Sequence, residues 1–298
     1  MKWAAAVLTI GVVTQIGALP STAALYGQQQ NDGGAAKPPQ IAGGKVVESA
    51  ASGSLVQQVR GVPGPAWVGY AIAAIPGHRG CCYSVNNGVC STGCALEGGY
   101  FQGAACPANS NESTVFLEGE RTANIMFRVD HGEVVKVRLF SPACQIDIGD
   151  LTLHWITGVR TSDSIAFLKT LSPTDGMRVV SAIGAHADPA ADAYLRETAE
   201  SQTADRRDRE RAAMMLASTR GASGMAVVLR LLKDDTDEKL RASLPGALAQ
   251  APNFAGTNTL MDVATTDKDR KVRERAFFWL GRSKDPRAQK FIEEILSK

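Results

Sequence analysis

The sequence predicts an α+β protein in which a small, disulfide-stapled antiparallel β domain precedes a C-terminal α-solenoid. Two observations carry this prediction. In the region that contains all six cysteines, apolar and polar residues alternate as they do along half-buried strands. From Asp163 onward the apolar residues return at helical spacing, and the helical pattern itself repeats. A chain of 298 residues is long enough for two domains with separate cores.

We divide the chain into four parts. Residues 1–24 are predicted to be a signal peptide, 25–44 a disordered linker, 45–160 the cysteine-rich β domain and 161–298 an α-solenoid of about four repeats. The linker assignment depends on composition, because this segment is rich in Gly, Gln and Pro and has almost nothing to bury.

The N-terminal segment has the order of features of a secretory signal. Lys2 precedes an apolar run that ends at Leu19, and small residues follow at positions 21–24. A membrane anchor is the alternative, but it needs about 20 apolar residues, and Thr14 and Gln15 interrupt this run. We therefore expect an exported protein, periplasmic or secreted, with no membrane span after cleavage.

The clearest strand pattern covers residues 124–140. Apolar residues alternate with polar ones on both sides of the turn at Asp130-His131-Gly132, which predicts a hairpin with one buried face. Residues 66–75 and 150–157 are expected to add further strands.

Cysteines are confined to the β domain. An even number of cysteines in an exported chain usually indicates disulfides, and we expect three. Zinc is the alternative, but the string CCYSVNNGVCSTGC lacks the paired CxxC spacing of zinc knuckles. Their pairing stays open. The disulfide candidates are Cys81, Cys82, Cys90, Cys94, Cys106 and Cys144.

The C-terminal half contains an internal repeat. Apolar anchor residues recur at spacings of 33, 32 and 32, and a second apolar set lies 12 residues after each anchor. Self-similarity at this period predicts stacked helical hairpins. The anchors are Ile183, Leu216, Leu248 and Leu280. The second set is Leu195, Val228, Leu260 and Ile292.

Charged residues recur with the same period. Each of three copies has an Asp 11 residues before its anchor, where its carboxylate is expected to cap a helix. An Arg follows four residues later and is expected to pair along the helix or between stacked copies. These residues are Asp205, Asp237, Asp269, Arg209, Arg241 and Arg273.

The last copy is KVRERAFFWLGR with an Asp before it and SKDPRAQKFIEEIL after it. It resembles the HEAT-like repeats named for phycobilisome lyases. The copy that contains Pro245 departs from this pattern, because a proline inside the helix is expected to bend or shorten it. The resemblance implies an α-solenoid that binds other proteins. It does not imply bilin chemistry, because the repeats contain no cysteine. A cysteine-containing β domain before such repeats is similar to the N-terminal regions of some exported bacterial proteins.

Motifs of known reactions are absent from the sequence. It contains no HExxH, GxSxG, GxxxxGK[ST] or CxxCH, and we predict no catalytic residue, metal ligand or cofactor. We interpret His131, His154 and His186 as turn or surface residues. His78 lies beside Cys81 and is the one place where a metal or thiol role is conceivable.

The charge balance bears on partners. With 32 Lys and Arg against 30 Asp and Glu, the chain lacks the strongly basic character of a nucleic-acid binder. The sequence favours an extracytoplasmic scaffold, not an enzyme, that binds a protein partner, one with acidic character. The alternative is a hydrolase-like enzyme or a redox-responsive envelope factor, with its site near His78 and the cysteines.

Helical geometry locates a candidate binding face. Positions nine, five and two before each anchor fall opposite the buried stripe and are expected to form a basic ridge with exposed apolar side chains. The alternative is a solvated face that Glu210 and Glu274 neutralise. The ridge residues are Arg178, Arg207, Arg211, Met214, Lys239, Lys271, Arg275 and Phe278.

Overall fold

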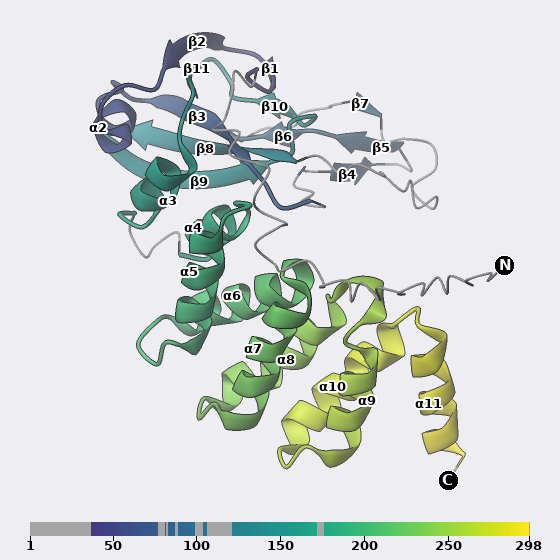
Figure 1. The fold of residues 1–298 in the computed structure, drawn as a ribbon. Coiled ribbons are helices and arrows are strands. Elements are labelled where there is room, and N and C mark those ends of the chain that lie inside the picture. Colours follow the sequence, from purple (N-terminus) through teal and green to yellow (C-terminus); the bar gives the residue numbers. More distant parts are fainter. Residues whose placement is uncertain are drawn as a thin grey trace, which may run out of the picture. The chain divides into compact units, whose positions relative to one another are not determined.

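The structure is a computed structural model that describes residues 37–76, 81, 83–86, 89–98, 104–105, 121–171 and 176–297 (Figure 1). The predicted signal peptide and most of the predicted linker lie outside these residues. Within them the chain is α+β, as predicted, with three sheets and ten α-helices. None of the helices in the described ranges is long and apolar enough to cross a membrane.

A five-stranded sheet forms the centre of the N-terminal region. Its strand order is β2 (Lys45–Ala50), β11 (Thr152–Thr157), β3 (Ala66–Ala73), β8 (Thr122–Asp130) and β9 (Glu133–Phe140). The predicted hairpin is confirmed as β8 and β9, which pair antiparallel, and β3 pairs antiparallel with β8.

The prediction of an antiparallel domain is wrong for the other half of this sheet. Strand β11 lies between β2 and β3 and is parallel to both. Parallel neighbours need a crossover connection, and helix α2 (Leu55–Arg60) lies in the connection from β2 to β3. Turn signals reveal hairpin neighbours, but they do not reveal a strand that is inserted later in the chain.

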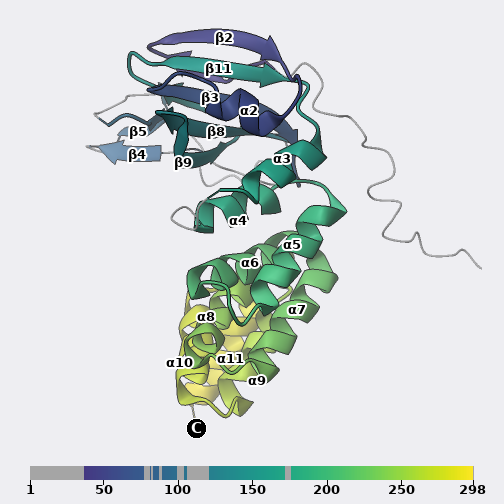
Figure 2. The ribbon, with the colours of Figure 1, turned by 90° about the vertical axis from the view of Figure 1, so that its left-hand side faces the viewer.

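The middle strands β3 and β8 are buried on both faces, whereas the hairpin that contains β8 was predicted to bury one face. On one face Tyr70, Ile125 and Phe127 pack with α2 and with α3 (Thr161–Leu168), which lie beside the sheet in Figure 2. On the other face Trp67 and Trp155 pack with a second cluster. The alternation along β8 is therefore incomplete, because both of its faces are apolar.

A small parallel sheet covers the second cluster. It contains β1 (Gln40–Ala42), β10 (Gln145–Asp147) and β6 (Cys94–Ala95). Residues 40–42 were predicted to be linker and instead form a strand, because β10 pairs with their backbone and Ile41 packs against the core. A third sheet contains β4 (Tyr83–Asn86), β5 (Val89–Thr92) and β7 (Ala104–Ala105).

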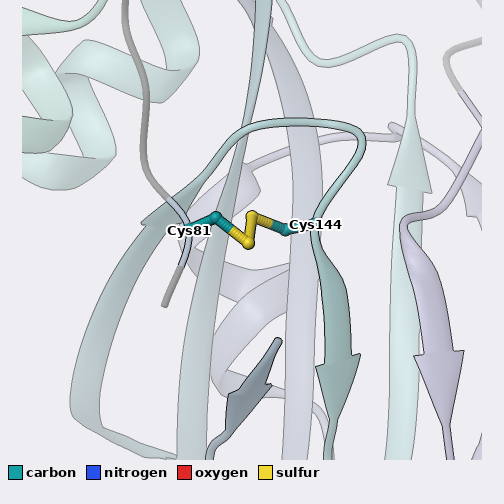
Figure 3. Close-up of a disulfide and its surroundings, with 2 residues drawn as sticks. All are labelled: Cys81 and Cys144. Carbon is teal, nitrogen blue, oxygen red and sulfur yellow. A yellow bond between two sulfur atoms is a disulfide. The ribbon is translucent and has the colours of Figure 1, made fainter. Parts of the chain in front are cut away.

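A disulfide joins Cys81 to Cys144, with 5.6 Å between the two Cα atoms (Figure 3). Cys144 is buried in the second cluster. Cys94 is also disulfide-bonded. The side chains of the other three cysteines lie outside the described residues, so the number of three bridges stays a prediction.

The C-terminal region contains two rows of helices. The front row is α4 (Gly176–Gly184), α6 (Arg206–Thr219), α8 (Glu238–Ala249) and α10 (Arg270–Arg282). The back row is α5 (Pro189–Glu200), α7 (Gly221–Asp234), α9 (Thr257–Thr266) and α11 (Pro286–Leu296), with a 3-10 turn, η2 (Pro252–Phe254), before α9. Each front-row helix contacts the next, and Figure 2 shows α6, α8 and α10 on one side and α5, α7 and α9 on the other.

The periodic residues of the sequence lie where these rows pack together. All four anchors are buried, as are the first three residues of the second set, and Ile292 is partly buried. The three Asp caps are confirmed: they accept bonds of 2.8 to 2.9 Å from the backbone N–H of Arg207, Lys239 and Lys271. Helix α8 continues past Pro245 and has 12 residues, against 14 in α6 and 13 in α10.

The repeated arginines act between copies. Arg209 and Arg241 are buried and pair with Asp235 and Asp267, each in the copy that follows. The hydrogen-bond acceptor is therefore the Asp two residues before the capping Asp, although Arg241 also lies 3.9 Å from the capping Asp269. Arg273 instead donates to the backbone carbonyl of Asp267 at 2.7 Å.

The sheet and the first helices share one core. Val179 and Ile183 of α4 belong to the same buried cluster as Val68 and Phe127 of the sheet. The predicted division at residues 160 and 161 matches the start of α3, but it does not separate two cores. The change from strand to helical periodicity near residue 161 marks where the secondary structure changes, but the hydrophobic core continues across that boundary.

Candidate functional site

A groove runs across the front row over α8. Its larger part has a volume of about 430 Å³, and a neighbouring part of about 340 Å³ shares Ala242 and Arg275 with it. Helix α8 supplies the floor, and α6 and α10 supply the walls. We call this surface the α8 groove. The floor residues are Ala242, Ser243 and Gly246, and the exposed Lys239 lies at the start of α8. The wall residues used below are Glu210, Met214, Lys271, Glu274, Arg275, Phe278 and Trp279.

The groove exists because one copy of the repeat carries small side chains. At three positions separated by the 32-residue repeat, α6 and α10 have large side chains and α8 has small ones. In α6 these residues are Glu210, Arg211 and Met214, and in α10 they are Glu274, Arg275 and Phe278. In α8 they are Ala242, Ser243 and Gly246. The copy that departs from the repeat pattern therefore forms the floor of the site.

Trp279 forms an aromatic wall. A Cβ atom at Gly246 would lie 3.1 Å from its Nε1, so the absence of a side chain there lets the indole pack against α8. Phe278 stacks edge-on against it, with ring centroids 5.4 Å apart, and Arg282 lies over the Phe278 ring. The indole N–H makes no hydrogen bond with the described residues, so it is a free donor in the groove.

Three cations of the groove have no carboxylate partner among the described residues, whereas the fourth, Arg206, pairs with Glu210. Lys239, Lys271 and Arg275 form no ion pair with any residue that the structure describes. The two acids named in the solvated-face alternative each pair with an arginine of their own helix. Glu210 accepts from Arg206 at 2.5 Å and Glu274 accepts from Arg270 at 2.7 Å, each one turn away on its own helix.

The structure brings together most of the predicted ridge. Met214, Lys239, Lys271, Arg275 and Phe278 line the α8 groove. Arg207 is exposed at the start of α6 and Arg178 is exposed on α4, and neither lines it.

Arg211 has a different place from the one predicted. It is partly buried and its Nε donates to Ser181 Oγ at 2.7 Å, so it ties α6 to α4. Burial also lowers the pKa of its guanidinium. Trp279, one residue before the buried anchor Leu280, is partly exposed in the groove. Comparing the repeat copies position by position would have revealed the small residues opposite it.

A second polar cluster lies inside the core. The Oγ of Ser164 is 2.9 Å from both Tyr70 OH and His186 Nε2. His186 Nδ1 faces the carbonyl oxygens of Ala182 and Ile183 at 2.9 and 3.1 Å. A carbonyl only accepts, so Nδ1 carries the proton and Nε2 accepts from Ser164.

This cluster has a structural role in the described fold. His186 was predicted to be a turn or surface residue; it does follow α4, but its side chain is fully buried, as are those of Ser164 and Tyr70. Burial lowers the pKa of His186 to about 4, which keeps the ring neutral, and burial raises the pKa of Tyr70. A serine beside a neutral histidine resembles a nucleophile and its base, but no solvent reaches either side chain.

The other histidines do not form a site. His131 is exposed in the β8–β9 turn, as predicted, and His154 lies on β11, where burial lowers the pKa of its ring. His78 lies outside the described residues. In the ranges that the structure describes, no three His, Cys, Asp or Glu side chains gather closely enough to hold a metal ion.

Comparison of the chain with protein-family models and with curated proteins finds no match.

Proposed function

We propose that this chain is an extracytoplasmic scaffold that binds a protein partner through the α8 groove. In this proposal the two helix rows are an α-solenoid of HEAT-like repeats, which present a continuous surface built from successive copies. The observation that carries it is the groove itself, in which unpaired cations lie beside exposed aromatic and thioether side chains. Arg and aromatic residues together are typical of binding hot spots.

The repeat assignment is supported by three periodic features. The anchors are buried, an Asp caps each of α6, α8 and α10, and a buried Arg–Asp pair joins successive copies. Export is supported by the signal-like N-terminus and by the Cys81–Cys144 disulfide, since disulfides are stable in oxidising compartments. The enzyme or redox-factor alternative near His78 gains no specific support from the described residues.

Site-specific crosslinking tests this function. A photo-crosslinking amino acid is placed at Phe278 in the groove wall, and in a separate chain at Lys290 on the exposed surface of α11. Each chain is expressed in the native host and illuminated. We expect one discrete adduct from the Phe278 position and none from Lys290.

Charge reversal then identifies the contact. Lys239→Glu combined with Arg275→Glu should remove the Phe278 adduct while the far-UV circular dichroism stays unchanged. No adduct from any position along α6, α8 and α10 would contradict the scaffold function. An adduct that survives the double substitution would show that the groove cations do not hold the partner.

A further inference from the structure

We infer that the α8 groove binds a short extended peptide segment in which acidic residues alternate with apolar ones. This inference rests on the proposed function and goes beyond it, because it names the chemistry of the bound segment. An extended chain places successive side chains on opposite sides, so one set can enter the floor while the other meets the rims.

The floor of the groove accepts apolar side chains. Ala242 leaves space there, Met214 lies on the α6 side, and the Trp279 indole, packed over Gly246, lies on the α10 side. A thioether and an aromatic face adapt to side chains of different shapes. The combined volume falls in the range of about 300 to 1,000 Å³ that is usual for ligand sites.

The rims of the groove carry charge for carboxylates. Lys239 lies at the start of α8, and Arg275 lies on α10 where the two parts of the groove meet. Both are unpaired among the described residues, so a carboxylate does not have to displace an internal partner. The hydroxyl of Ser243 is already occupied, because it donates to the Leu240 carbonyl at 2.7 Å. Selectivity for acid therefore depends on the cations and on the free N–H of Trp279.

The distribution of charge favours a peptide over a polyanion. Glu210 and Glu274 line the same groove as the cations. A continuous anionic surface, such as an anionic membrane, would meet these carboxylates as well as the lysines. A peptide with a few spaced carboxylates can contact Lys239 and Arg275 and place uncharged residues near the two glutamates. Charge complementarity thus selects an alternating segment.

Trp279 provides a direct readout. Trp67 and Trp155 are fully buried, and Trp3 belongs to the predicted signal peptide. Among the described residues Trp279 is therefore the solvent-accessible tryptophan, and excitation at a wavelength that only tryptophan absorbs reports on it. The probe is a capped heptapeptide of alternating aspartate and leucine. Two matched peptides replace all aspartates by asparagine or all leucines by serine. The assay uses the full mature chain with its disulfides intact and measures both fluorescence change and protection from acrylamide quenching.

We expect saturable binding of the acidic–apolar probe, with Trp279 protected from acrylamide, and at least about tenfold weaker binding of each matched peptide. Lys239→Gln combined with Arg275→Gln should lower the affinity for the probe by about tenfold or more. Ala242→Glu places in the floor the glutamate that α6 and α10 carry at the equivalent repeat position, and it should lower the affinity for the probe by a similar factor. Lys290→Gln on α11 is the matched control and should leave the affinity unchanged.

Several results would overturn the inference. They are no protection of Trp279 by the probe, equal binding of the asparagine peptide, or equal affinity of the Ala242→Glu chain with its helical content intact. Binding to phosphatidylglycerol vesicles without binding to the probe would also overturn it. If the probe fails but crosslinking at Phe278 still captures a partner, the peptide mode is wrong and the scaffold function stands. If both fail, the function fails as well.

Discussion

The guanidinium of Arg241 is held by Asp267 from the next copy of the repeat. Its Nη2 lies 3.0 and 3.1 Å from the two carboxylate oxygens, and its Nε donates to the Leu232 carbonyl at 2.7 Å. Asp267 also accepts from the backbone N–H of Asp269, the cap of α10. One buried pair therefore joins α8, the end of α7 and the start of α10. Arg209 and Asp235 form the same arrangement one copy earlier.

Loss of one member of this pair should be costly. We expect Arg241→Ala to lower the free energy of unfolding by about 2 to 4 kcal/mol, because the mostly buried Asp267 loses its charged partner. Urea unfolding followed by far-UV circular dichroism measures this. Arg270→Ala is the control: its pair with Glu274 is exposed and should contribute less than about 1 kcal/mol. Equal losses in the two variants would contradict the assigned role.

Close contacts between rows give a second prediction. A Cβ atom at Gly224 would lie 2.0 Å from the carbonyl oxygen of Leu216, and one at Gly256 would lie 2.1 Å from that of Leu248. Both glycines are eight residues after an anchor. Gly224→Ala should therefore destabilise the chain by about 1 to 3 kcal/mol, because backbone atoms must move apart.

Gly281 supplies the control for this substitution. It lies in α10, and a Cβ atom added to it would meet no described atom within 4 Å. Gly281→Ala should be neutral or stabilising by up to about 1 kcal/mol, since alanine favours the helix. Thermal unfolding of the two variants compares them directly. A Gly224→Ala chain as stable as the Gly281→Ala chain would argue against close row contact.

The disulfide gives a third prediction. We expect a peptide map of the unreduced protein to contain a Cys81–Cys144 crosslink. Replacing both by Ser should lower stability by about 2 to 4 kcal/mol, because the bridge restricts the unfolded chain across a separation of 63 residues. The loss should extend to α4, because Ile183 packs in the same core as the sheet. A map with Cys144 as a free thiol would exclude this pairing.

Much of the helical region could be predicted because its determinants are local and repeated. Asp237 caps α8 through its immediate neighbours, and Leu248 is buried by the helix period, so both follow from spacing. The partner of Arg241 could not be assigned, since the sequence offers several aspartates within reach. The parallel pairing of β11 could not be predicted either, because β11 pairs with strands that lie far earlier in the sequence and no turn connects it to them.

The candidate site was predictable in part. Positions opposite the anchors located Lys239, Arg275 and Phe278 on one face, because helix geometry fixes direction. Arg211 lies on the same predicted face, but its side chain is turned away from the groove by a hydrogen bond to Ser181 of the neighbouring helix. The depth of the groove depends on Gly246 lying beside Trp279, which is a relationship between copies and not within one helix.

Buried His186 predicts how stability changes with pH. Its pKa is lowered from 6.5 to about 4, chiefly by burial, with Arg220 adding to this and Asp188 opposing it. Between these two values the unfolded chain binds a proton that the folded chain does not, so stability falls as the pH falls. The contribution is fully present above about pH 6.5, and the whole shift is worth about 3 kcal/mol.

Chemical unfolding at pH 7 and at pH 5 tests this contribution. The wild-type chain should lose more stability on acidification than His186→Asn, whose amide can still donate to the Ala182 carbonyl but takes up no proton. The variant is expected to be less stable at pH 7, because it loses the bond from Ser164. His131→Asn is the matched control, since it removes an exposed histidine from a turn whose positive φ of 48° suits asparagine. It should leave the pH dependence of wild type unchanged. An identical loss between pH 7 and pH 5 in the wild-type and His186→Asn chains would show that another group carries the acid sensitivity of the fold.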